Sequence, residues 1–134
     1  IDINISSFIP ESYIEDASQK IEIYQDIADC RNEEDIQNII DEIIDRYGNM
    51  PAEVENLIKI ARIKNLCKEK NVIKIQERPN GIAFTFSEID RHKVADWIEI
   101  YKTNIRYSET IKPMVTISEK KDAITVVNEF LERI

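Results

Sequence analysis

The chain has 134 residues, and its 26 acidic and 18 basic side chains give a formal net charge of −8 at pH 7. Apolar residues make up 43% of it and charged residues 33%, proportions that are typical of a globular protein and exclude a wholly disordered chain. No run of roughly 18 apolar residues is present, so no membrane-spanning helix is predicted. This length suits one hydrophobic core, and we therefore expect residues 1–134 to form a single domain.

The first residue and the cysteines indicate where such a chain functions. Ile1 stands where a complete protein has methionine, and no basic segment followed by an apolar run opens the sequence. We therefore expect a piece of a longer polypeptide without a signal peptide. Cys30 and Cys67 are too few for a disulfide framework, and both lie among apolar helical positions. They are expected to be free, buried thiols in a cytoplasmic protein.

The negative charge is concentrated in one part of the chain. Residues 1–50 hold 13 acidic and 3 basic side chains, whereas residues 51–134 hold 13 acidic and 15 basic side chains. An acidic half disfavours direct contact with nucleic acid phosphates and suits a basic protein surface. The alternative explanation is a solvated acidic face that keeps the domain in solution.

The chain begins with a predicted short strand and a first helix. Alternating isoleucines at residues 1–5 are typical of a strand, and Pro10 marks a turn after it. Asp16 or Ser18 is positioned to cap a helix that follows. The apolar stripe expected to face the core on this helix consists of Ile21, Tyr24, Ile27 and Ala28.

A second helix is predicted from Asn32 to Tyr47. Asn32 is the expected N-cap, and Asp35 stands three residues later as in a capping box. Gly48 follows the helix at the position that favours a left-handed residue, and Pro51 prevents continuation and can begin the next helix. Its inward positions are Ile36, Ile39, Ile40, Ile43, Ile44 and Tyr47.

A third helix is predicted from about residue 52 to residue 70, and it is the most basic element. Short connections predict that the three helices pack as antiparallel neighbours. The apolar positions of this helix are Val54, Leu57, Ile58, Ala61, Leu66 and Cys67. Its basic side chains are Lys59, Arg62, Lys64, Lys68 and Lys70.

The pattern changes to short strands after residue 71. Strands are predicted at residues 72–75 and 82–86 around a Pro79-Asn80-Gly81 hairpin turn, in which Gly81 supplies the required conformation. Asp90 can cap a helix that carries Val94, Trp97, Ile98 and Tyr101. Strands at 105–107 and 114–117 and a final helix at 123–134 complete the chain. The fold class is α+β: helical hairpins followed by a small mixed or antiparallel sheet with two packed helices.

Motifs for catalysis, metal binding or cofactor binding are missing from the sequence. His92 is the only histidine, so no zinc site is predicted. The two glycines, Gly48 and Gly81, are both explained by turns, and no glycine-rich phosphate loop exists. No carboxylate sits in an apolar context that would prepare it for acid–base catalysis. We therefore expect neither an enzyme nor a cofactor.

One group of charged residues suggests a binding role. Glu42, Asp45 and Arg46 occupy positions i, i+3 and i+4 and so share one helix face. The simplest interpretation is an internal Glu42–Arg46 pair that stabilises the helix by a few tenths of a kcal/mol. The functional interpretation is a mixed-charge patch that docks on a complementary surface carrying arginines.

Three segments resemble the C-terminal domain of bacterial transcription-repair coupling factors, the Mfd family. They are IPESYI at residues 9–14, the helix at residues 19–28, and EIIDRYGNMPAEVENL at residues 42–57. The resemblance covers about residues 1–78 and includes the motif positions Pro10, Tyr47, Gly48 and Pro51. The departures are lysine for arginine at residue 20, Gln-Asp for a basic pair at residues 25–26, and tyrosine for phenylalanine at residue 47.

The resemblance implies a role in transcription-coupled repair. The family consists of DNA translocases that displace stalled RNA polymerase and recruit the nucleotide-excision repair protein UvrA, and ATP hydrolysis belongs to motor domains outside this chain. In the resting family fold, the C-terminal domain packs on a UvrB-like module, masks its UvrA-binding surface and restrains the motor. At the matching positions, Glu42, Asp45 and Arg46 are the implied docking residues, with arginines and an apolar residue as partners.

This resemblance leads to an expected set of partners. The UvrB-like module of the same polypeptide is the direct partner, and UvrA and RNA polymerase are affected indirectly. A cytoplasmic monomer without direct nucleic acid contact is expected. Two alternatives remain: an accessory nucleic-acid-binding module that uses the basic third helix, and a stand-alone enzyme of unknown type.

Overall fold

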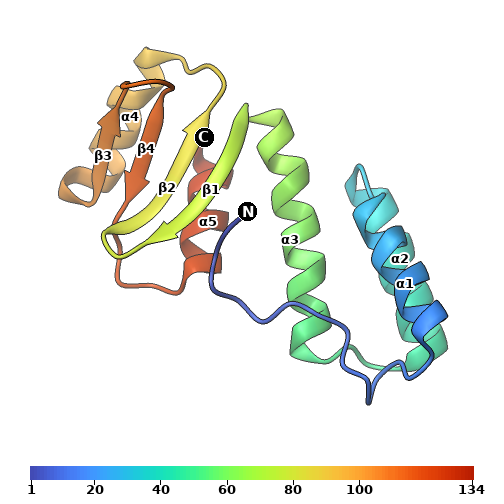
Figure 1. Ribbon diagram of the computed structural model, residues 1–134. Coiled ribbons are helices and arrows are strands. Elements are labelled where there is room, and N and C mark those ends of the chain that lie inside the picture. The colour runs from blue at the N-terminus through green and yellow to red at the C-terminus, as the bar shows by residue number, and fades with distance from the viewer. The chain divides into compact units, whose positions relative to one another are not determined.

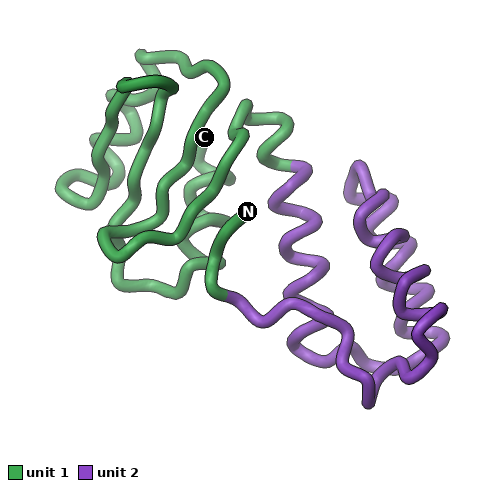
Figure 2. Tube along the Cα trace, in the orientation of Figure 1, with its two compact units in different colours: residues 1–4, 66–134 green, residues 5–65 purple.

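The computed structural model describes residues 1–134 and contains two compact units (Figure 2). Unit 1 comprises residues 1–4 and 66–134, and unit 2 comprises residues 5–65. Unit 2 is helical, whereas the sheet and the last two helices belong to unit 1 (Figure 1). None of the five helices combines the length and apolar character that crossing a membrane requires. The α+β class predicted from the sequence is confirmed.

Unit 2 is built from helices α1 (Ala17–Ala28), α2 (Glu33–Tyr47) and the greater part of α3 (Ala52–Glu69). Short connections join the helices, and all three contribute to one hydrophobic core together with the turn before α1. The buried members of this core are Ile9, Ile14, Ile23, Ile27, Cys30, Ile36, Ile39, Ile43, Val54, Ile58 and Ala61.

Helix α1 begins where the sequence predicted, but only one residue of its predicted apolar stripe is buried. Asp16 is the N-cap, and its Oδ1 accepts a hydrogen bond of 2.9 Å from the Gln19 amide. Ile21 and Tyr24 were expected to face the core, yet they are 57% and 38% exposed. Ile27 is buried as predicted, and the other buried residue of the helix is Ile23. This face continues into Cys30. Packing against the rest of unit 2 decided which apolar residues of the helix are buried.

Tyr24 keeps a structural role from its exposed position. Its hydroxyl oxygen accepts a hydrogen bond of 2.7 Å from the Ile9 amide, so it fixes the segment that precedes α1. Ile44 of α2 was also expected to face inward and is 42% exposed.

The predicted strand at residues 1–5 is wrong in extent. Only Asp2 pairs with the sheet, through a single parallel bridge to Gln76. The Asp2 amide donates to the Ile75 carbonyl at 2.8 Å, and the Glu77 amide donates to the Asp2 carbonyl at 2.7 Å. The next available amide, that of Asn4, bonds to the Glu77 side chain instead of to the backbone. This side-chain bond ends the pairing.

Unit 1 contains an antiparallel four-stranded sheet in the order β1-β2-β4-β3. The strands are β1 (Val72–Arg78), β2 (Gly81–Phe86), β3 (Ile105–Ser108) and β4 (Met114–Ile117). Helix α4 (Arg91–Tyr101) and a short 3-10 turn (Lys102–Asn104) lead into β3, and helix α5 (Ala123–Arg133) ends the chain. Both helices lie behind the sheet in Figure 1 and cover the same face of it.

The core of unit 1 is centred on Phe130 of α5. Its ring lies 4.5 Å from that of Phe84, 5.3 Å from Trp97 and 6.0 Å from Tyr101. Offset and edge-to-face contacts at such distances stabilise an aromatic cluster beyond the area it buries. Of the apolar residues named for α4, Val94, Trp97 and Tyr101 are buried, whereas Ile98 is 47% exposed.

The hairpin between β1 and β2 forms at the predicted turn. Gly81 has a φ of 137°, and a Cβ atom added there would collide with the Ile117 carbonyl of β4. Glycine is therefore required for conformation and for space.

Replacing Phe130 with alanine is expected to lower the free energy of unfolding by about 3–5 kcal/mol, because the variant leaves a cavity among aromatic rings. Urea denaturation followed by circular dichroism measures the change. Ile111→Ala is the control, because this isoleucine is 94% exposed, and it should shift the free energy by less than about 0.5 kcal/mol. A similar effect for both variants would contradict the assignment of Phe130 to the core.

The two cysteines are free and buried, as expected. Burial raises the pKa of the Cys67 thiol from 9.0 to about 11. The unfolded chain loses this proton near its ordinary pKa, so the contribution to stability is complete below pH 9.0 and is lost as the pH rises to about 11.

Alkylation of Cys67 by iodoacetamide is therefore expected to stay slow across neutral pH and to accelerate toward pH 11. Mass spectrometry of the labelled chain at several pH values measures the rate, with the urea-unfolded chain as the reference. A folded chain that reacts as fast as the unfolded one at pH 8 would disprove the burial.

Candidate docking site at the end of helix α2

Local hydrogen bonds fix both ends of helix α2. The Asn32 side chain accepts from the Asp35 amide at 2.8 Å, and the Asp35 carboxylate accepts from the Arg31 amide at 3.0 Å. At the other end, the Gly48 amide donates to the Ile44 carbonyl at 2.9 Å. Gly48 has φ 84° and ψ −165°, a conformation that is essentially restricted to glycine. The predicted cap and stop residues of this helix are confirmed.

The structure places the three predicted docking residues together on the exposed side of α2. Ile36, Ile39 and Ile43 are the buried residues of this helix, whereas Glu42, Asp45 and Arg46 are exposed beside them. The Glu42 and Arg46 side chains are 46% and 34% exposed, and Arg46 Nη1 lies 3.4 Å from Glu42 Oε1. Their pairing is the internal interaction that the spacing predicted.

Asp45 differs from its two neighbours. It is exposed, and no cation or hydrogen-bond donor pairs with its side chain in the structure. A solvated carboxylate needs no partner, but it is available for one without the loss of an existing bond. The site therefore presents one free carboxylate beside an ion pair.

Tyr47 connects the site to the rest of unit 2. The Arg46 guanidinium carbon lies 5.0 Å above the centre of the Tyr47 ring, within the range of a cation–π interaction. The Tyr47 hydroxyl donates to Gln19 Oε1 at 3.0 Å, and its ring lies 5.9 Å from that of Tyr13. Arg46 is thus held from two sides, by Glu42 and by the tyrosine ring. The tyrosine at residue 47, where the resembled family has phenylalanine, gains the bond to Gln19.

The IPESYI segment supports the same helix end. The Pro10 carbonyl accepts from the amides of Tyr13 and Ile14, which closes a turn whose flanking isoleucines are buried. The Tyr13 hydroxyl donates to the Gly48 carbonyl at 2.6 Å. Burial raises the pKa of Tyr13, and the neighbouring Tyr47 raises it further. The proline, tyrosine and glycine motifs therefore meet at one place in space.

An acidic depression begins beside Glu42 and extends toward the end of α1. It was not predicted from the sequence. Burial raises the pKa of the Cys30 thiol, and the nearby carboxylates raise it further. The only sequence signal for this surface is the excess of acidic over basic side chains in residues 1–50. Its lining residues are Asp26, Asp29, Cys30, Asp35, Asn38, Ile39 and Glu42.

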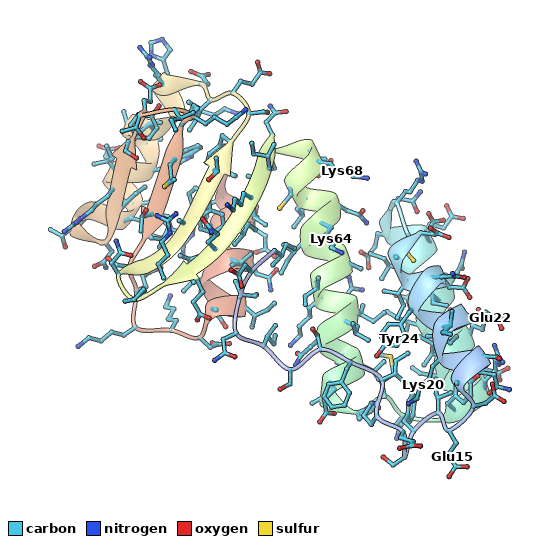
Figure 3. All side chains as sticks on the ribbon, in the orientation of Figure 1. Glu15, Lys20, Glu22, Tyr24, Lys64 and Lys68 are labelled. Carbon is cyan, nitrogen blue, oxygen red and sulfur yellow. The ribbon has the colours of Figure 1, made fainter.

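The basic residues of α3 do not form a continuous stripe. Arg62 is already bound by Glu33 of α2, with Nη2 and Oε1 2.6 Å apart, and this bond lowers the pKa of Glu33. Lys59 and Lys64 are five residues apart and project from different sides of the helix. Lys64 and Lys68 share a side, as Figure 3 shows. This arrangement is a poor match for a run of nucleic acid phosphates.

His92 lies exposed in the first turn of α4, after the Asp90 N-cap. The structure contains no group of three or more histidine, cysteine, aspartate or glutamate side chains arranged to hold a metal ion.

The chain matches a known family model. The family model described as TRCF domain matches residues 3–97. This range includes α1, α2, α3 and the β1–β2 hairpin, and therefore all residues of the candidate docking site.

Curated relatives match along the chain. The transcription-repair-coupling factor of Rickettsia prowazekii is 37% identical over 98% of this chain, and that of Bacillus subtilis is 36% identical over 66% of it. The Escherichia coli protein of the same name is 23% identical over the whole chain. The chain spans only 12% of the length of the Rickettsia prowazekii and Escherichia coli proteins and 8% of the Bacillus subtilis protein.

A solved structure shares the fold. The crystal structure of the C-terminal domain of a transcription-repair coupling factor superposes with a TM-score of 0.78 at 22% sequence identity. The superposition covers 98% of this chain and 86% of that one.

Replacing Gly48 with alanine is expected to lower the free energy of unfolding by about 1–3 kcal/mol. No atom lies within 4 Å of an added Cβ, so the cost arises from the backbone conformation alone. Urea denaturation measures it, with the exposed neighbour Asn49→Ala as the control. An alanine variant as stable as the original chain would contradict the helix end described above.

Proposed function

The chain belongs to the TRCF domain family, and on this basis we propose that it is a C-terminal regulatory domain that restrains a transcription-repair coupling factor by docking on another part of it. The proposed partner is the UvrB-like module of the same polypeptide, and the proposed effect is to mask its UvrA-binding surface. All of residues 1–134 are included in this domain, which itself performs no catalysis. The parent protein would be a cytoplasmic, ATP-driven DNA translocase that displaces stalled RNA polymerase during nucleotide-excision repair.

The observation that carries the proposal is the arrangement at the end of α2. Glu42, Asp45 and Arg46 share one exposed side, and Arg46 is held in place by a carboxylate and an aromatic ring. A preorganised arginine loses less conformational entropy when it binds, and planar guanidinium and carboxylate groups pair with defined geometry. The free Asp45 carboxylate and the acidic depression beside Glu42 favour a partner surface that carries arginines.

A clamp of this kind need not be tight. Tethering within one polypeptide supplies an effective concentration of the order of millimolar for a short flexible link. A contact that contributes only a few kcal/mol of free energy then keeps the masked state dominant. The contact still opens when a partner binds the open state better. Surface ion pairs of modest individual strength suit such a contact.

Two observations bear on the alternative, an accessory nucleic-acid-binding module. The basic residues of α3 are spread around the helix, and Arg62 is bound by Glu33. The acidic half of the chain adds repulsion toward phosphates. We therefore retain docking as the function.

Reversing both charges in the full-length parent protein, Glu42→Lys with Asp45→Lys, is expected to raise UvrA binding and basal ATPase activity. A rise of roughly tenfold corresponds to about 1.4 kcal/mol of lost clamp free energy. Binding is measured by titration with purified UvrA, and ATPase by phosphate release without DNA.

The matched control is Glu99→Lys with Glu132→Lys, which changes the net charge equally at exposed positions of α4 and α5. It is expected to leave both activities unchanged. If the α2 variant also leaves both unchanged, the proposed clamp is incorrect.

A further inference from the structure

The sheet of unit 1 has a second face, and its composition follows from the strand register. Opposed residues on antiparallel strands point to the same face, and neighbours along a strand alternate. Phe84 and its cross-strand partners Ile75 and Val115 point toward α5, because Phe84 contacts Phe130 there. The residues that precede and follow these three in their strands therefore point to the opposite face.

Two complete rows cross this opposite face, which we call the open sheet face. Helices α4 and α5 both lie on the other side of the sheet (Figure 1), so no helix of unit 1 covers it. The first row is Lys74, Thr85, Met114 and Ser108, and the second row is Gln76, Ala83, Thr116 and Arg106. Arg78, opposite Gly81, extends the face at its end.

The open sheet face is cationic in a chain of net charge −8. Lys74, Arg78 and Arg106 are exposed on it, and its strand residues include no carboxylate. Glu77 belongs to the covered side of β1, because it opposes Ile82. Asp2, bridged to Gln76 beyond the outer edge of β1, contributes one negative charge at the border. Cations thus stand on both outer strands.

The side chains in the middle of this face are uncharged and mostly small. Ala83 is 1% exposed, and Met114, Thr85 and Thr116 are half-buried. Arg78 lies across it, since Nη2 donates to Gln76 Oε1 at 2.9 Å and Nη1 lies 3.8 Å from Met114 Sδ. These two contacts anchor the guanidinium over the face while the arginine stays exposed. A polarizable methionine at the centre adapts to partners of different shape.

The chemistry of the face distinguishes between two classes of anionic partner. Sheet faces that bind single-stranded nucleic acid carry aromatic side chains on which bases stack. The only tyrosine in these strands, Tyr107, opposes Val115 and so lies on the covered side. Three cations supply few phosphate contacts for a duplex, and the overall negative charge repels it. Arginine forks that flank a small, partly apolar centre match carboxylates on a protein.

We propose that the open sheet face is a docking site for an acidic protein segment, whose carboxylates pair with Lys74, Arg78 and Arg106 and whose backbone crosses the half-buried Met114 and Thr116. Only residues of unit 1 take part, so the proposal does not depend on the site at the end of α2.

The test titrates the isotopically labelled 134-residue chain with a synthetic peptide of alternating glutamate and threonine and follows the amide chemical shifts by NMR. Shifts are expected in β1, β2, β4 and β3 at the residues of the two rows. A variant with Lys74→Gln, Arg78→Gln and Arg106→Gln should bind the peptide about tenfold more weakly, since three exposed ion pairs are lost.

The matched control carries Lys93→Gln, Lys112→Gln and Lys120→Gln, which removes the same charge at exposed positions outside the two rows. It should bind as the original chain does. Equal weakening in both variants, or shifts that map outside the rows, would overturn the proposal. A parallel titration with duplex DNA decides the partner class: binding of DNA but not of the peptide, with a steep salt dependence, would also overturn it.

Discussion

The backbone reversal at Gly48 is the constraint on which the candidate docking site depends. With φ 84° and ψ −165°, the chain leaves α2 in a direction that side chains with a Cβ rarely permit. The Gly48 carbonyl is then free to accept from Tyr13, and Tyr47 is placed between Tyr13 and Arg46. The hydrogen bond between the end of α2 and the turn around Pro10 therefore depends on one residue without a side chain.

The boundaries of α2 could be predicted because local signals agree there. Its cap, its apolar period and its glycine stop all indicate the same helix, and each depends only on neighbours in the chain. On helix α1, Ile27 is buried as predicted, but Ile21 and Tyr24 are exposed and Ile23 is buried in their place. Only packing selects among these residues, so sequence periodicity was insufficient.

The functional surfaces also differ in whether local sequence or tertiary packing determines them. The grouping of Glu42, Asp45 and Arg46 follows from helical spacing, and the structure places them on one exposed side. The acidic depression unites Asp26 of α1 with Glu42 of α2, and this requires the two helices to be packed. The cationic rows of the sheet require a strand order in which β4 lies between β2 and β3, which no local pattern encodes.

The bridge at Asp2 has a consequence for association between chains. An exposed strand edge is a template for another strand, and fibrils grow when a sheet offers two such edges. Asp2 covers part of the outer edge of β1, and the Asn4 bond to Glu77 lies beside it. Strand β3, with only four residues, is the other edge. Pairing through β3 would end at two copies, so the first residues protect the sheet against open-ended polymerisation.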